Sequence, residues 1–262
     1  NGNVGSGYDT SGTRPFATVV PGIDDAAQLA MNTRSACVRH GNGTVSCWSS
    51  ATSAPVAVPG LDDAVDLSAG SGHRCVIRAG GTVSCWGSNY LGQLGDGTTT
   101  DRSVPTPVPG LTGVVRISAG DGHTCAILVG GSIRCWGVNN HGQLGRGDMD
   151  NIGDDESPSA GSPVDLGPGR TAVALASGYE HTCAILDNGS LRCWGLNNRG
   201  QLGNGTTTQS TTPVTVSGLF TVVHLTAGYE HACAVLADGT VRCWGRNDYG
   251  QLGDGTTTPR TT

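Results

Sequence analysis

Lysine is absent from the sequence. All 15 basic residues among the 262 are arginine, and 21 acidic residues bring the formal net charge to −6. Schiff-base and acid–base chemistry that depends on lysine is therefore excluded. Nucleic-acid binding needs a basic surface, so we expect no nucleic-acid partner. Codon usage in a G+C-rich genome is a sufficient explanation for the missing lysine.

Long apolar runs and enzyme motifs are missing as well. No stretch of 18 apolar residues occurs, so we expect no transmembrane helix and no insertion into a membrane. The chain has no signal-peptide pattern and begins at Asn1, which we interpret as the start of a processed or excised product. The motifs G-x-S-x-G and H-E-x-x-H do not occur, and the glycine-rich turns lack the strand-to-helix context of a phosphate loop. No paired carboxylates suggest general acid–base work. We expect no enzyme, no catalytic residue and no cofactor.

Aromatic residues are scarce, at 5% of the chain, whereas glycine is abundant, with 43 residues. A core must then rely on Val, Ile, Leu, Ala and the five tryptophans, and the glycines suit many tight turns. The length is ample for one large all-β domain over residues 1–262.

An internal repeat organises the chain. The stretch 178–203 returns, little altered, at 228–253, and earlier copies run over 70–95 and 120–145, with a degraded copy at 37–48. Self-similarity at about 50 residues is typical of solenoids and propellers.

Each copy holds two cysteines ten positions apart, followed by tryptophan. In the fourth copy a three-residue turn centred on Asn188 places Cys183 directly opposite Cys193 in a hairpin, within reach of a disulfide. The same arithmetic predicts five disulfides, in hairpins near 37–48, 75–86, 125–136, 183–194 and 233–244: Cys37–Cys47, Cys75–Cys85, Cys125–Cys135, Cys183–Cys193 and Cys233–Cys243. No C-x-x-C occurs, so zinc is a weak alternative and we expect no metal site. Paired cysteines indicate an oxidising, extracellular or cell-surface location.

Two further strands complete each unit. An apolar run precedes the hairpin, at 64–69, 114–119, 172–176 and 222–227, and a Pro- and Val-rich segment such as 104–109 follows it as an edge strand. Four short antiparallel strands per repeat predict a β-propeller of about five four-stranded blades, each of roughly 50 residues.

The motifs G-x-x-H, the D-G turn, W-G and N-x-x-G-Q-L-G together resemble the repeat of the regulator of chromosome condensation (RCC1) family. The resemblance implies a propeller, most often seven-bladed, and a protein-binding role. The cysteine pairs depart from the common intracellular pattern and suggest a secreted branch. Guanine-nucleotide exchange, the activity of the namesake, is a less favoured alternative because it is intracellular and chromatin-linked.

The two terminal segments, 1–36 and 245–262, resemble the later and earlier parts of a repeat. We expect them to complete one shared blade, which would close five copies into a ring. The segments partly duplicate one another, so two alternatives stay open: a piece of a longer propeller, and an open arc that pairs with a neighbouring molecule.

Histidine occupies the same place in four copies, at His73, His123, His181 and His231. Equivalent residues in different blades do not converge on one ion, so we expect each imidazole to bond to backbone within its own blade. The segment 148–156 carries five acidic residues; we interpret it as a solvated loop, with a calcium site as the alternative. Asn42, Asn188 and Asn204 begin N-glycosylation sequons, which N-G turns produce readily by chance.

Successive turns alternate between the two faces of a ring, so the G-x-x-H turns and N-x-x-G-Q-L-G loops should share one face. We predict that this face binds a protein through the variable residues Tyr90, Asp121, His141, Tyr179, Glu180, Arg199, Tyr229, Glu230 and Tyr249, since Tyr and Arg are common hot spots. The alternative function is a structural or adhesive subunit that self-assembles by completing blades between molecules.

Overall fold

The computed structural model describes residues 19–32, 35–49 and 51–262. These residues form 18 β-strands in five antiparallel sheets, which we call blades one to five. The strands, in chain order, are β1 (Ala26–Met31), β2 (Ser35–His40), β3 (Val45–Ser49), β4 (Val56–Ala57); β5 (Ala64–Ala69), β6 (His73–Arg78), β7 (Val83–Gly87), β8 (Arg102–Pro107); β9 (Val114–Ala119), β10 (His123–Leu128), β11 (Ile133–Gly137); β12 (Ala172–Ser177), β13 (His181–Leu186), β14 (Leu191–Gly195), β15 (Ser210–Thr215); β16 (Val222–Ala227), β17 (His231–Leu236), β18 (Val241–Gly245).

The all-β propeller predicted from the repeat is confirmed. Within each blade the strands pair in chain order, from an innermost strand (β1, β5, β9, β12 or β16) outward. Blades one, two and four have four strands. In blades three and five the outermost position is a single bridge, Gly137 to Ile152 and Gly245 to Arg260. Prolines lie in the outer strands β8 and β15, where an edge tolerates a missing N–H.

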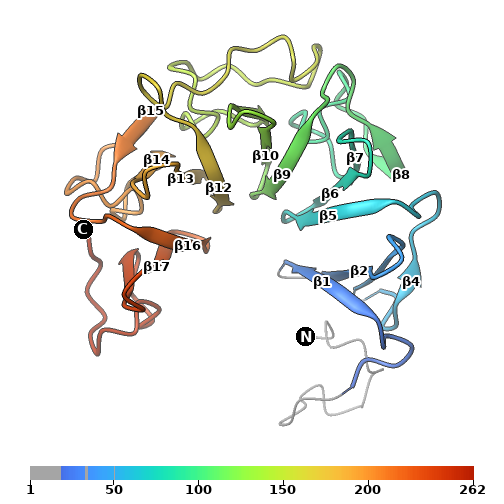
Figure 1. Cartoon of the computed structure of the whole chain (residues 1–262), viewed down its shortest axis with the longest axis horizontal. Helices are drawn as coiled ribbons and strands as arrows, with labels where there is room; N and C mark the ends of the chain where they lie inside the picture. Colours follow the sequence, from blue (N-terminus) through green and yellow to red (C-terminus); the bar gives the residue numbers. More distant parts are fainter. Residues whose placement is uncertain (1–18, 33–34, 50) are drawn as a thin grey trace.

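The blades follow one another around an axis, with their innermost strands side by side in the order β1, β5, β9, β12, β16. Figure 1 shows that the described residues trace an open arc, with a gap between blade five and blade one. The prediction of a shared terminal blade stays untested, since residues 1–18 lie outside the described part. The described flanks pair within their own blades: β1 with β2, and Arg260 with Gly245. Strand β1 was not predicted, because Ala26–Met31 lacks the glycine that ends its counterparts.

The hairpin register matches the prediction in all five copies. Cys183 and Cys193 are Cα partners, and the Gly189 N–H donates to the Leu186 carbonyl across a three-residue turn. Gly189 has φ +75°, the left-handed conformation that such a turn needs in its last residue. All ten cysteines are paired as predicted, at Cα–Cα distances of 4.0–4.1 Å.

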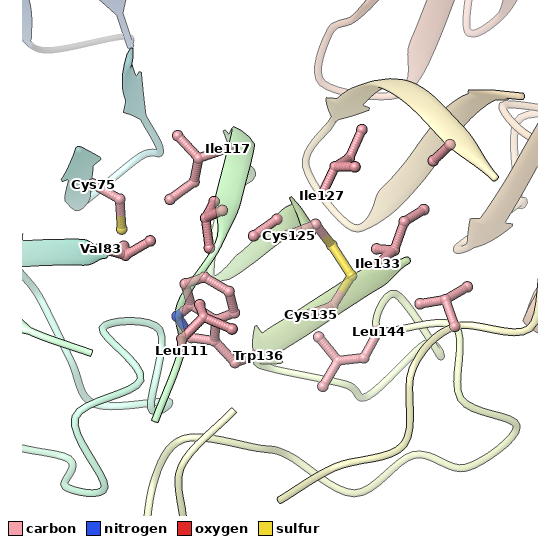
Figure 2. Close-up of a cluster of buried hydrophobic side chains, with 14 of the residues drawn as sticks. Cys75, Val83, Leu111, Ile117, Cys125, Ile127, Ile133, Cys135, Trp136 and Leu144 are labelled. Carbon is pink, nitrogen blue, oxygen red and sulfur yellow. A yellow bond between two sulfur atoms is a disulfide. The ribbon is translucent and has the colours of Figure 1, made fainter. Parts of the chain in front are cut away.

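The core lies between blades rather than inside any single one. Trp136 of blade three is fully buried against blade two, beside the Cys125–Cys135 disulfide and Leu111 (Figure 2). Its indole Nε1 donates to the Gln93 carbonyl of blade two at 3.0 Å, and Trp194 and Trp244 repeat the contact at the next two interfaces. Each blade is therefore stabilised by its neighbours, as in other repeat architectures. None of the described segments is a helix that could cross a membrane.

Candidate protein-interaction face

The innermost strands of neighbouring blades come unusually close where each ends in glycine. A Cβ atom placed on Gly120 would lie 2.5 Å from the Gly178 carbonyl oxygen, and one on Gly178 would lie 2.6 Å from that of Gly228. Real side chains are not found this close to backbone, so the glycine of G-x-x-H is required for blade-to-blade packing. It brings the turns that follow it together around the axis.

For two of the four histidines, His73 and His123, the expected backbone partner within the same blade was wrong. The imidazole Nε2 of His73 lies 2.7 Å from Oγ1 of Thr124, and that of His123 lies 2.9 Å from Oγ1 of Thr182, in each case a residue of the next blade. Burial lowers the pKa of His73 and of His123 to about 3, so both rings are neutral at neutral pH. The motif thus links blades instead of fixing its own turn.

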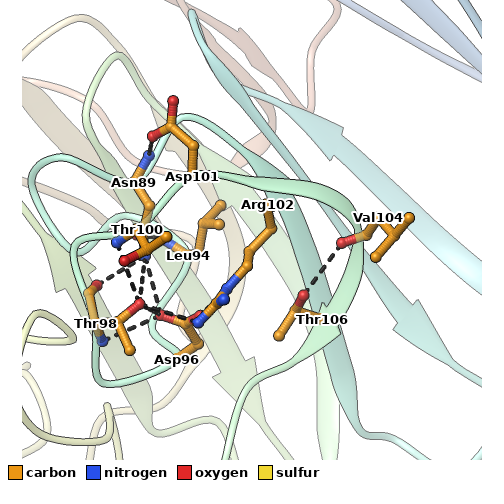
Figure 3. A network of polar contacts seen from close by, with 9 residues as sticks. All are labelled: Asn89, Leu94, Asp96, Thr98, Thr100, Asp101, Arg102, Val104 and Thr106. Atoms are coloured by element: carbon orange, nitrogen blue, oxygen red, sulfur yellow. Dashed lines mark hydrogen bonds and ion pairs between the residues drawn. The ribbon is translucent and has the colours of Figure 1, made fainter.

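The N-x-x-G-Q-L-G loops are held by a buried asparagine. In blade two the Asn89 amide donates to Asp96 Oδ1 at 3.0 Å and to the Thr98 carbonyl at 2.7 Å, and its oxygen accepts from the Leu94 N–H at 2.9 Å (Figure 3). Arg102 Nε binds Asp96 Oδ2 at 2.6 Å. Burial opposes ionisation of Asp96, but hydrogen bonds from Thr98, Arg102 and Asn89 outweigh it and hold the pKa of this carboxyl below its usual value.

The turns and the loops share one face, which we call the axial face. The N–H of the residue after W-G donates to the carbonyl of the residue before His: Leu196 to Glu180 and Arg246 to Glu230, each at 2.8 Å. We call the opposite face, which carries the turns between the cysteines, the hairpin face. The structure therefore supports the geometry on which the predicted binding residues were grouped.

Two tyrosines stack on the axial face. The rings of Tyr179 and Tyr229, from the turns of blades four and five, have centroids 4.0 Å apart and planes inclined by 22°. Backbone bonds join the turns of blades three, four and five, from the Asp121 N–H to the Tyr179 carbonyl at 3.3 Å and from the Tyr179 N–H to the Tyr229 carbonyl at 3.2 Å. A hydrogen bond with Tyr229 and burial raise the pKa of Tyr179. Tyr229 is 54% exposed.

Glu180 lies beside this stack. Its Oε2 is 3.5 Å from Nε2 of His141 in the preceding blade. Burial raises the pKa of Glu180; the His141 charge lowers it, while the negative charges of Asp121 and Glu230 raise it further, and the net shift is upward. The three acidic residues are thus near neighbours.

Arg246 organises the other side of the face. Its guanidinium binds Glu230 Oε2 at 3.0 Å and Asp248 Oδ2 at 2.8 Å, and it lies 5.4 Å from the Tyr249 ring centroid. Arg199 approaches Asp248 at 3.9 Å. Sequence reasoning missed Arg246 and Asp248. The only signal was their position in the last repeat, where Arg246 directly follows W-G and Asp248 lies within N-x-x-G.

The predicted binding residues are therefore brought together with one exception. Tyr90, on the loop of blade two, is 65% exposed and has no hydrogen bond, ion pair or ring contact with the others among the described residues. Glu230 is only 9% exposed, and its carboxylate binds Arg246. A cavity of about 420 Å³ opens at the axis of this face; its lining includes Gly70, Gly120, Gly178, Gly228, Asp121, Tyr179 and Tyr229.

The acidic segment 148–156 lies apart from the axis. The carboxylates of Asp154, Asp155 and Glu156 gather within 4.8 Å of one another. Asp148 is not part of this group, because Arg146 binds it at 2.9 Å and the Asn139 amide donates to it. Asp150 is outside the group as well, so the calcium alternative keeps three of its five acidic residues. The segment lies in the connection between blade three and blade four.

Comparisons with known proteins place the fold in a family. The structure of Kap60 bound to yeast RCC1 (Prp20) matches over 90% of this chain and 60% of the other, with a TM-score of 0.80 and 21% identity. Human WBSCR16 matches over 91% and 65%, with a TM-score of 0.77 and 20% identity. The chain thus spans about three fifths of the length of these propellers. A search of curated protein sequences finds no match. The model of the RCC1-like domain matches residues 19–262, and the chain belongs to the RCC1-like family.

Proposed function

We propose that this chain is a non-enzymatic protein-interaction propeller that works outside the cytoplasm and binds its partner through the axial face. The observation that carries the proposal is the cluster around the Tyr179–Tyr229 stack, where two tyrosine rings and the carboxylate of Asp121, from three blades, line one cavity. Tyrosine and arginine dominate binding hot spots, and rigid elements position them well.

The scaffold beneath the cluster favours this use. The turns of blades three and four are anchored to the next blade by backbone bonds, and the loops are held by buried asparagines. A face that is ordered before binding loses little conformational entropy in the complex. The net charge of −6 favours a protein over a nucleic acid as the partner.

The cysteines support the proposed location outside the cytoplasm. Five disulfides pair all ten cysteines, and such bonds persist in oxidising surroundings. Yeast RCC1 (Prp20) binds Kap60, and its binding to Gsp1p and to histones has been characterised. The similarity between this chain and Prp20, at 21% identity, shows a shared fold only, and we do not assign an exchange activity to this chain.

The test is capture of partners from the secreted fraction of the source organism by the immobilised, oxidised protein. We expect Tyr179→Ala/Tyr229→Ala to lose the captured protein, with a melting temperature lowered by no more than a few degrees, since a stacked aromatic pair contributes about 0.5–1.5 kcal/mol. The matched control is Val129→Ala/Phe220→Ala, which removes exposed side chains at the hairpin face. Unchanged capture by the tyrosine variant would contradict the proposal.

A second candidate function, self-assembly, rests on an uncovered face of blade five. Val241 is 62% exposed, whereas its counterparts Leu191 and Ile133 are completely buried under the following blade. A second copy of the chain offers a blade of the same repeat to cover it. Light scattering over a concentration series decides between the candidates: assembly predicts a rising mass that Val241→Asp returns to 26.5 kDa, and a binder stays at 26.5 kDa throughout.

A further inference from the structure

The lining of the axial cavity combines backbone and small residues with one carboxylate and two tyrosine rings. The innermost strands β5, β9, β12 and β16 converge at this cavity (Figure 1). Because neighbouring blades come close at their terminal glycines, backbone makes up part of the lining, together with small side chains and with Met31 and Asn32 of blade one. Few side chains other than Asp121, Tyr179 and Tyr229 give the cavity charge or aromatic surface. Its volume of about 420 Å³ accommodates one long side chain rather than a folded segment.

Asp121 differs from the other carboxylates of this face. Glu180 is paired with His141, and Glu230 is paired with Arg246. Asp121 has neither an ion pair nor a side-chain hydrogen bond among the described residues, although its charge acts on both Tyr179 and Glu180. A half-buried carboxylate without a partner favours a cation in the adjacent cavity, where charges interact more strongly than in water.

The tyrosine stack lies next to that carboxylate. Since the centroids are 4.0 Å apart, no group enters between the rings, and only their outer faces are available. A planar guanidinium stacks on the face of tyrosine and is attracted by the ring quadrupole. A tyrosine ring of the cavity can therefore stack on a guanidinium group while Asp121 accepts hydrogen bonds from the same cation.

We propose that this cavity is a receptor for one cationic side chain, an arginine by preference, presented by an exposed segment of the partner. The proposal rests on the proposed function and names the group that the axial face recognises. Arginine is preferred to lysine because it combines planar stacking with bidentate pairing to a carboxylate.

The site is tested on the isolated oxidised protein, without any partner. The probes are the blocked peptides acetyl-Gly-Arg-Gly-amide, its lysine analogue and its citrulline analogue, which keeps the shape of arginine without the charge. Titration is followed by NMR on the ring signals of Tyr179 and Tyr229. We expect the arginine peptide to shift both rings in a saturable way, the lysine peptide to bind several-fold more weakly, and the citrulline peptide to leave both rings unmoved.

Asp121→Asn should weaken binding of the arginine peptide at least fivefold. It should leave the dispersed spectrum of the folded protein intact, because that carboxylate makes no hydrogen bond or ion pair among the described residues. The control is Asp24→Asn, an exposed carboxylate before β1 at the hairpin face, with unchanged binding. Equal binding of the citrulline peptide, or unchanged binding by Asp121→Asn, would overturn the proposal. Peptide binding that fails while capture still depends on the tyrosines would reject the cation site and leave the proposed function standing.

Discussion

His123 Nε2 lies 2.9 Å from Oγ1 of Thr182, across the interface between blades three and four. The same bond joins His73 to Thr124 one blade earlier. Each threonine hydroxyl also donates to a glutamine carbonyl of the preceding blade, as Thr182 does to Gln143 at 3.0 Å. Histidine and threonine therefore form a polar link inside an otherwise apolar interface, and both members are completely buried.

The last interface lacks this link and offers a stabilising substitution. His181 faces blade five, where alanine, Ala232, replaces threonine, and neither ring nitrogen of His181 has a hydrogen-bond partner among the described residues. We expect Ala232→Thr to raise the free energy of unfolding by about 1 kcal/mol, the usual net contribution of a hydrogen bond. Chemical denaturation measures the change. Ala232→Val, which has the same shape without the hydroxyl, is the control, and an equal gain from valine would assign the effect to packing.

Acid should destabilise the protein through these histidines. Burial lowers the pKa of His73, His123 and His181 to about 3, whereas unfolded histidine titrates near 6.5. Between these values the unfolded chain binds protons that the folded chain does not, so stability is fully present above pH 6.5 and falls as the pH falls toward 3. Each histidine contributes a slope of about 1.4 kcal/mol per pH unit.

The slope can be assigned by substitution. His123→Gln should reduce the dependence of unfolding free energy on pH by about that amount between pH 6 and 4.5, whatever its effect on stability at pH 7. His224→Gln, which changes an exposed histidine on β16, should leave the slope unchanged. A slope that is the same in both variants would show that the buried rings do not govern acid unfolding.

The five disulfides should differ in their reaction with a reductant. Cys233 and Cys243 of blade five are half-buried, whereas Cys125 and Cys135 are buried beneath the next blade. Thiolate attack requires access to sulfur, so mild reduction of the folded protein should open the disulfide of blade five first. Differential alkylation followed by peptide mass spectrometry measures the order. In denaturant the order should disappear, since all five pairs enclose equal loops.

The buried asparagine of the N-x-x-G-Q-L-G loop should matter far more than its neighbour. Asn139 is completely buried, and its side chain accepts from the Leu144 N–H at 3.0 Å and donates to Asp148 at 2.9 Å. Asn139→Ala leaves these groups without partners and should cost about 1–3 kcal/mol of unfolding free energy. Asn140→Ala, at the exposed next position, should cost less than about 0.5 kcal/mol. Thermal unfolding of the two variants side by side gives the comparison.

Much of the blade could be predicted because its hairpin is specified by residues that are close together in the sequence. The spacing of Cys183 and Cys193 and the glycine of the turn define a hairpin register within eleven residues, and hairpin pairing depends on the turn between the strands. The same reasoning failed for β1, since Ala26–Met31 has no terminal glycine and its partner strand begins with a degraded copy of the repeat.

The sequence by itself determined the repeat, the hairpins, the disulfide pairs and the grouping of turns and loops on one face, because each follows from short-range periodicity. Only the tertiary structure decided that His123 bonds to the next blade, that Arg246 binds Glu230, and that Asp121 lines the cavity without an ion pair or side-chain hydrogen bond among the described residues. These relationships join residues of different repeats, and their geometry depends on how blades pack around an axis, which no spacing within one repeat encodes.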